Sequence, residues 1–79
     1  MKYTIKVFGI ARDIMGGRDV VVESQSKNVK ELKSQLMTTY PALQKLNSLL
    51  IAVNEEYAED DLLLSESDEL ALIPPVSGG

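Results

Sequence analysis

Apolar and polar side chains alternate at the start of the chain. Every second residue between Lys2 and Phe8 is apolar, and a period of two is typical of a strand with one buried face. The pattern predicts a strand that ends at Phe8, whose side chain adds an apolar group to the otherwise polar face. Gly9 interrupts the pattern, and residues 10–15 are expected to form one short helical turn before the flexible pair Gly16-Gly17.

The next two segments differ in their period. Three consecutive valines in residues 19–24 favour an extended backbone and predict a second strand. From Val29 to Tyr40 apolar residues recur every three or four positions, which predicts an amphipathic helix. Asn28 and Glu31 have the spacing of a capping box at its start. Pro41 is expected to end the helix, because the residue before a proline is pushed away from helical dihedrals.

Three extended segments are predicted in the second half of the chain. Residues 49–53 are apolar throughout, which indicates a strand that is covered on both faces or lies centrally. Tyr57-Ala58 is expected to form a minimal edge strand. Residues 62–64 are expected to form a short turn whose leucine side chains fill part of the core. Residues 70–73 predict the last strand, which ends at Pro74-Pro75 because proline cannot donate to a ladder.

One helix among about five strands is an α+β layout with a mixed sheet. The simplest closure of such a small sheet puts the first and last strands side by side and parallel. Phe8 and Ile73 would then lie on the same outer face of the sheet. We expect residues 1–73 to form the folded domain and residues 74–79 to form an extended tail.

The size and composition of the chain narrow the function classes. A chain of 79 residues predicts one domain with a thin core, which disfavours a self-contained enzyme with a deep active site. Cys and His are absent, so the thiolates, imidazoles and usual zinc ligands are missing and no metal site is expected. Cysteines for disulfides are absent, and we recognise neither a basic-then-apolar leader nor an apolar run near 20 residues. We therefore expect a cytoplasmic protein that spans no membrane.

Charge is distributed unevenly along the chain. Residues 1–46 hold eight bases and four acids, a net charge of +4, whereas residues 47–79 hold eight acids and no base, a net charge of −8. An acidic half repels phosphate backbones and argues against nucleic-acid binding, while it favours steered encounter with a basic protein. Ordinary solubility is the alternative explanation. The carboxylate pairs Glu55-Glu56 and Asp60-Asp61 are interpreted as solvated surface.

The last residues carry the candidate chemistry. Glycine has no Cβ, so Gly78-Gly79 could pass through a narrow slot and present the terminal carboxylate to another protein's active site. Pro74-Pro75 would stiffen the base of this arm. A carboxylate must be activated before it reacts, and we expect an acyl phosphate or acyl adenylate made by another enzyme. The alternative is a frayed end without function.

The sequence from Leu72 to Gly79, Leu-Ile-Pro-Pro-Val-Ser-Gly-Gly, resembles the end of the small, sulfur-carrying subunits of molybdopterin synthase. Residues 7–12 and 50–54 are similar to that family's first-strand exit and central strand. The resemblance spans the whole chain and implies a β-grasp, ubiquitin-like fold. The Gly-Gly end alone is less specific, because thiamine-pathway sulfur carriers and ubiquitin-like modifiers share it.

The resemblance implies a reaction cycle that depends on partners. An adenylyltransferase related to ubiquitin-activating enzymes would adenylate Gly79 with ATP and magnesium, and a sulfur donor protein would convert the adenylate to a thiocarboxylate. The tail would then enter the large subunit of molybdopterin synthase, where sulfur passes to cyclic pyranopterin monophosphate. The chain would bind no cofactor stably, would not be catalytic alone and would form a heterotetramer with two large subunits.

The resemblance also implies roles for individual residues. Gly79 would carry the activated carbonyl, and Gly78 would let the backbone pass closely through the partner's channel. An apolar patch and the tail would bind the partner, and the candidates are Phe8, Leu62, Leu72, Ile73, Pro74, Pro75, Val76 and Ser77. Core packing is the alternative for the first four, and it is favoured for Leu62 and Leu72.

Other functions remain open on the sequence alone. The chain could be a sulfur carrier of the thiamine or cysteine pathway, a modifier that joins Gly79 to lysines of target proteins, or an interaction domain with an inert tail. The mass of the intact protein from its native cell separates these. Exchange of oxygen for sulfur supports a carrier, and covalent ladders on other proteins support a modifier.

Overall fold

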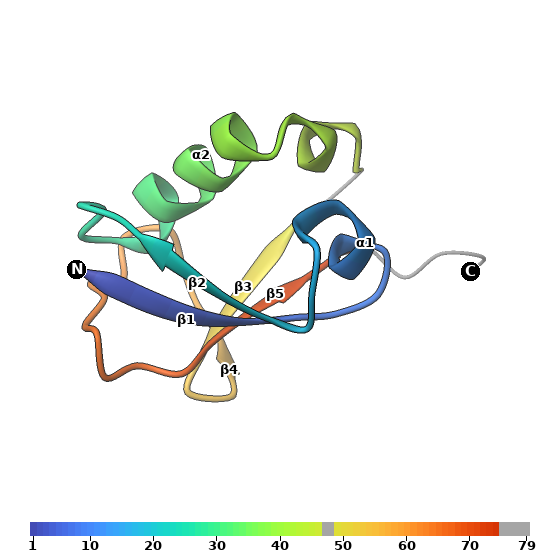
Figure 1. Cartoon of the computed structure of the whole chain (residues 1–79). Coiled ribbons are helices and arrows are strands. Elements are labelled where there is room, and N and C mark those ends of the chain that lie inside the picture. The colour runs from blue at the N-terminus through green and yellow to red at the C-terminus, as the bar shows by residue number, and fades with distance from the viewer. Residues whose placement is uncertain (47–48, 75–79) are drawn as a thin grey trace.

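The first and last strands of the chain lie next to each other at the centre of one mixed sheet (Figure 1). A computed structural model describes residues 1–46 and 49–74. The strand order is β2-β1-β5-β3-β4. The elements in chain order are β1 (Lys2–Val7), α1 (Ala11–Met15), β2 (Asp19–Glu23), α2 (Val29–Thr39), the 3-10 helix η1 (Pro41–Lys45), β3 (Leu50–Val53), β4 (Glu56–Tyr57) and β5 (Leu70–Ile73).

The central pair of strands confirms the predicted closure of the sheet. β1 and β5 are parallel, with Ile5 opposite Leu70 and Val7 opposite Leu72. The pairing continues one residue beyond β1, because the Phe8 amide donates to the Leu72 carbonyl over 3.2 Å. β2 and β3 are antiparallel to their neighbours in the sheet. The predicted α+β fold, a mixed sheet of five strands with one main helix, is therefore correct.

The main helix α2 begins and ends where its sequence predicts. The Asn28 side chain accepts a 2.9 Å hydrogen bond from the Glu31 amide, which is the expected N-cap. The Glu31 carboxylate in turn accepts from the Lys27 amide at 2.8 Å, one residue before the position of a standard capping box. Pro41 opens η1 directly after the helix. Within residues 1–46 and 49–74, no helix has the length and apolar character needed to cross a membrane.

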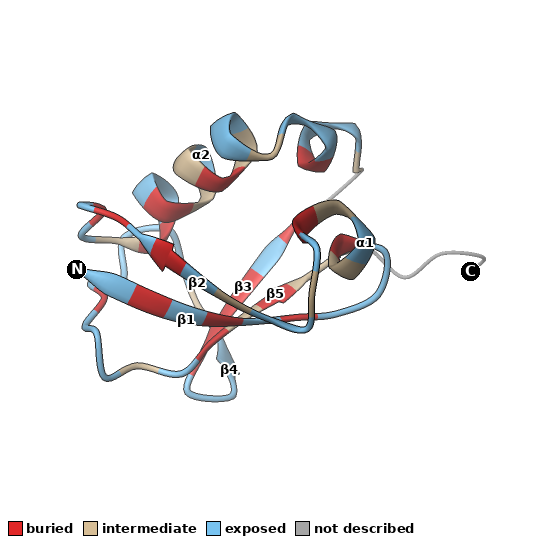
Figure 2. Ribbon diagram, in the orientation of Figure 1, coloured by how far each residue is buried: buried red, intermediate tan, exposed pale blue. Residues whose placement is uncertain are grey.

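The core lies between α2 and one face of the sheet (Figure 2). Val29, Leu32 and Leu36 of α2 are buried, and the buried residues of β1 are every second one, as the alternation predicts. None of the helices in residues 1–46 and 49–74 covers the opposite face of the sheet (Figure 1). We call this opposite face the outer face, and it carries side chains that alternate with those of the core.

The second half confirms one prediction and contradicts another. β3 lies centrally, between β5 and β4, and Ile51, Ala52 and Val53 are buried, although Leu50 is 46% exposed. In the run of three leucines, only Leu64 joins the core, whereas Leu62 and Leu63 are exposed. This segment runs beside the first turn of α2, where the Leu62 carbonyl accepts from the Val29 amide at 3.1 Å. Pairing with the helix start leaves two of the leucines in solvent.

Neighbouring residues of β5 offer a test of this orientation. We expect Leu72→Ala to lower the free energy of unfolding by about 3 kcal/mol, because truncating a fully buried leucine leaves a cavity in the core. Ile73→Ala, at the next position and facing outward, should cost about 1 kcal/mol or less. Urea unfolding of both variants measures the difference. Equal losses would contradict the assignment of the two faces.

Candidate functional site

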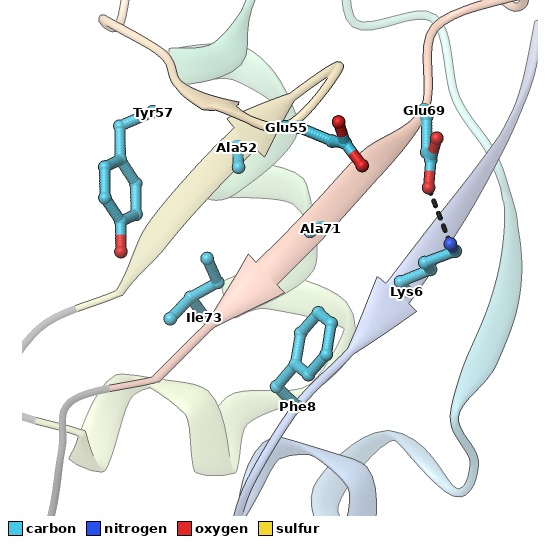
Figure 3. Close-up of a pocket in the computed structure, with 8 residues that line it drawn as sticks. All are labelled: Lys6, Phe8, Ala52, Glu55, Tyr57, Glu69, Ala71 and Ile73. Atoms are coloured by element: carbon cyan, nitrogen blue, oxygen red, sulfur yellow. Dashed lines mark ion pairs between the residues drawn. The ribbon is translucent and has the colours of Figure 1, made fainter.

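A groove of about 330 Å³ lies on the outer face of the sheet (Figure 3). Four strands contribute to it, so it crosses the sheet rather than following one strand. The lining residues are Lys6, Phe8, Ala52, Glu55, Tyr57, Glu69, Ala71 and Ile73. None of them belongs to the side of the sheet that packs against α2, and none of the described elements lies over the groove (Figure 3).

Small residues make the floor of the groove and large apolar residues make one end of it. Ala52 of β3 pairs directly with Ala71 of β5, so two methyl groups lie side by side where larger side chains would fill the depression. Phe8, Ile73 and Tyr57 surround this floor at the end where β5 leaves the sheet (Figure 3). Phe8 is 41% exposed and Tyr57 is 70% exposed, so together with Ile73 they give this end of the groove an apolar surface that a partner can contact.

Charged residues occupy the other end of the groove. The Lys6 ammonium lies 2.6 Å from the Glu69 carboxylate, in an ion pair that joins β1 to the start of β5. The hydrogen bond to Glu69, followed by that group's negative charge, raises the pKa of Lys6 above its usual value. Glu55 lies beside this pair, and its side chain points over the groove (Figure 3).

Glu55 occupies an unusual backbone position. It follows Asn54 in the turn between β3 and β4, and both residues have positive φ, 52° for Asn54 and 71° for Glu55. The Asn54 side chain accepts from the Glu69 amide at 3.0 Å and donates to Asp68 at 3.1 Å. These bonds tie the turn to the start of β5, so the Glu55 backbone is held firmly at the edge of the groove.

The base of the tail lies at the apolar end of the groove. Pro74 follows β5 directly and packs against Gly9, which has a φ of +59°. A Cβ added to Gly9 would lie 3.0 Å from Cγ of Pro74, so only glycine lets the two segments approach this closely. The contact therefore places Pro74 beside the residue at which the chain turns after β1.

Arg12 of α1 supports the same end of the groove. Its Nε donates to the Val7 carbonyl at 2.8 Å, and its guanidinium lies 5.6 Å from the centre of the Phe8 ring. A cation at this distance is attracted to the face of an aromatic ring. The arginine therefore holds the Phe8 ring in place on the outer face.

The structure brings some of the predicted site residues together and separates others. Phe8 and Ile73 lie on the same outer face, as expected, and both line the groove. Leu72 is fully buried, which confirms core packing, the interpretation favoured for it. Leu62 is 42% exposed, so core packing, which was also favoured for Leu62, is wrong, and its side chain does not line the groove.

The structure describes only the first residue of the predicted tail. Pro74 is described, and the remaining predicted tail residues, Pro75, Val76, Ser77, Gly78 and Gly79, lie outside the described residues. Their proposed roles stay predictions.

Several groove residues were not found from the sequence. Lys6 shares the outer face with Phe8 by simple alternation, and this signal was available. The sequence does not indicate that Ala52, Ala71 and Glu55 lie close together, because their proximity depends on strand register and on the geometry of the turn.

Among the described residues, no group of three potential metal ligands is present. The groove is lined mainly by apolar and charged side chains, an arrangement that suits binding.

Comparisons with known proteins agree with this geometry. The model of the ThiS family matches residues 5–79. The molybdopterin synthase sulfur carrier subunit of Arabidopsis thaliana is 34% identical over 77 residues, which cover 95% of this chain and 80% of that protein.

Two solved structures have the same fold. SAMP1 from Haloferax volcanii has a TM-score of 0.79 and 28% identity, and the match covers 100% of both chains. A complex of subunits 1 and 2 of molybdopterin-converting factor from Helicobacter pylori contains a chain that matches with a TM-score of 0.66 and 24% identity, again over 100% of both chains.

Proposed function

The chain belongs to the ThiS family, among the molybdopterin synthase sulfur carrier subunits, and from this membership we propose that it carries sulfur for the synthesis of molybdopterin. The observation that carries the proposal is the similarity, over 95% of this chain, to a molybdopterin synthase sulfur carrier subunit, and the family match extends through Gly78 and Gly79. The β-grasp fold supports it, since the apolar end of the groove lies where the tail begins.

The proposed chemistry takes place on the carboxylate of Gly79. A carboxylate oxygen attacks the α-phosphate of ATP, pyrophosphate leaves, and an acyl adenylate forms. Sulfur at the sulfide level, delivered by a donor protein, then attacks the carbonyl carbon, the bond to AMP breaks, and a thiocarboxylate forms. Its sulfur is a far better nucleophile than the carboxylate oxygen, so it can be passed to cyclic pyranopterin monophosphate. Once the sulfur is bonded to the pterin precursor, water cleaves the bond between that sulfur and the carbonyl carbon, and Gly79 returns to its carboxylate form.

This chain would supply the reacting carboxylate and a docking surface, and its partners would supply the catalytic groups. An adenylyltransferase related to ubiquitin-activating enzymes would hold the ATP and magnesium, so no cofactor needs to stay on this chain. The large subunit of molybdopterin synthase would receive the tail. The complex of two subunits in the Helicobacter pylori structure supports a large-subunit partner. A heterotetramer in the cytoplasm is the assembly and location that we propose.

Phe8 and Ile73 are the residues that we propose for the apolar contact with these partners. Both lie beside the tail's base, and neither is needed to fill the core. Pro74 and the tail residues Pro75, Val76 and Ser77 would continue the same contact toward the partner's active site. Gly78 would let the backbone pass through a narrow channel in that partner.

The mass of the intact protein, purified from its native cell, tests the proposal. We expect a fraction of the molecules to be heavier by the difference between one sulfur and one oxygen, with the change mapped to Gly79. The matched control is the same protein produced without the activating enzyme, which should show only the carboxylate mass.

Reconstitution distinguishes the remaining alternatives. With the large subunit and cyclic pyranopterin monophosphate, the thiocarboxylated protein should yield molybdopterin. A thiocarboxylate that yields none would point to a carrier of the thiamine or cysteine pathway. Covalent conjugates of Gly79 with lysines of other proteins, and no thiocarboxylate, would instead show a ubiquitin-like modifier.

A further inference from the structure

The groove on the outer face has an excess of one negative charge. Of its three charged lining residues, Lys6 and Glu69 neutralise each other in an ion pair. Glu55 remains, and no basic side chain of the described residues forms an ion pair with it. The charge of Glu55 also acts on the Lys6 ammonium, but without an ion pair the Glu55 carboxylate is available to a cation from a partner.

The shape of the groove indicates which cation fits. The alanine floor formed by Ala52 and Ala71 leaves a shallow channel that runs from the apolar end to Glu55 (Figure 3). A long side chain with an aliphatic stem and a charged head would bury its methylenes on this floor and place the charge at Glu55. Lysine and arginine both have such a stem.

Arginine fits the groove better than lysine. Its planar guanidinium can bind a carboxylate with two hydrogen bonds and can also lie against an aromatic ring. Tyr57 presents an exposed ring at the edge of the groove. Phe8 already accepts a guanidinium from within the chain, that of Arg12, which shows that this surface suits such contacts.

We propose that the groove receives an arginine side chain of the large synthase subunit and that Glu55 recognises its guanidinium. The inference rests on the proposed function, and it names the residue on this chain that makes docking selective for a basic partner. The eight acids in residues 47–79 would attract such a partner at long range. Glu55 acts at short range, once the partner is in contact.

The backbone of Glu55 supports a role in binding rather than in folding. A glutamate at a φ of 71° is strained, and asparagine or glycine would adopt this conformation more easily. We therefore expect Glu55→Asn to have a melting temperature equal to or above that of the unchanged protein. Loss of binding in such a variant could not be assigned to a weaker fold.

Calorimetric titration with the purified large subunit tests the inference. We expect Glu55→Gln and Glu55→Asn to weaken binding about tenfold at low salt, as for the loss of one charge-assisted hydrogen bond at an interface. The difference from the unchanged protein should shrink at high salt, because screening weakens the charge interaction. Blocking the large subunit's arginines with phenylglyoxal should weaken its binding to the unchanged protein more than its binding to Glu55→Gln.

Glu56→Gln is the matched control, since it removes the same charge one residue away, from a side chain that does not line the groove. It should change the affinity less than about twofold. If Glu55→Gln and Glu56→Gln weaken binding equally, or if neither does, the inference is wrong while the proposed function stands. If the unchanged protein does not bind the large subunit, both are overturned.

Discussion

Appending one alanine after Gly79 is expected to abolish sulfur transfer, because the reacting carboxylate would then belong to another residue and lie beyond the activating site. Gly79→Ala should reduce transfer by about a hundredfold, since a methyl group beside the carbonyl misplaces it in a channel shaped for glycine. The measurement is molybdopterin formed in a reconstituted system with the activating enzyme, the sulfur donor and the large subunit.

Gly17→Ala is the control for these changes. Gly17 has no positive φ, and a Cβ there would meet nothing closer than the Asp19 carbonyl at 4.0 Å. This variant should transfer sulfur at the normal rate, and all three variants should unfold at the same urea concentration. Full transfer by the extended protein would refute the proposal that the chain works through Gly79.

Gly9→Ala is expected to have the next largest effect, a loss of about tenfold in sulfur transfer. The added methyl would lie 3.0 Å from Cγ of Pro74, so the base of the tail must shift by a few tenths of an ångström. Small displacements at the base change where the end of the tail arrives, and misplacement of reacting groups is costly. The variant should also lose about 1 kcal/mol of stability, because alanine is strained at positive φ.

Gly16→Ala separates these two effects. Gly16 has a φ of +85°, so alanine is strained there as well, but nothing lies within 4 Å of the added methyl. We expect a similar loss of unfolding free energy and normal sulfur transfer. Urea unfolding and the reconstituted assay, run on both variants, measure the two quantities. An equal loss of transfer in both variants would show that the Gly9–Pro74 contact does not direct the tail.

The sequence predicts most of this fold because its periodicities are strong. Alternation over Lys2 to Phe8 assigned each side chain of β1 to the correct face, and the capping residues placed the start of α2 correctly. The run Leu62 to Leu64 was different. Three identical residues contain no alternation, so nothing in the pattern indicated that only Leu64 would reach the core.

The candidate site was harder to predict for a different reason. The groove exists because Ala52 lies directly opposite Ala71, and that register follows from the packing of the sheet rather than from either segment alone. Glu55 looked like solvated surface because the adjacent Glu56 has the same charge. Only the turn geometry distinguishes them, since it directs one carboxylate over the groove and the other away from it.

The position of β5 has a consequence for how the protein withstands pulling. A force that pulls on the segment after Pro74 acts on β5. This strand is hydrogen-bonded to β1 on one side and to β3 on the other. Because β1 runs parallel to β5, tension between the two ends of the chain shears their hydrogen bonds together instead of opening them one by one. A partner can therefore exert tension on the tail while residues 1–73 stay folded.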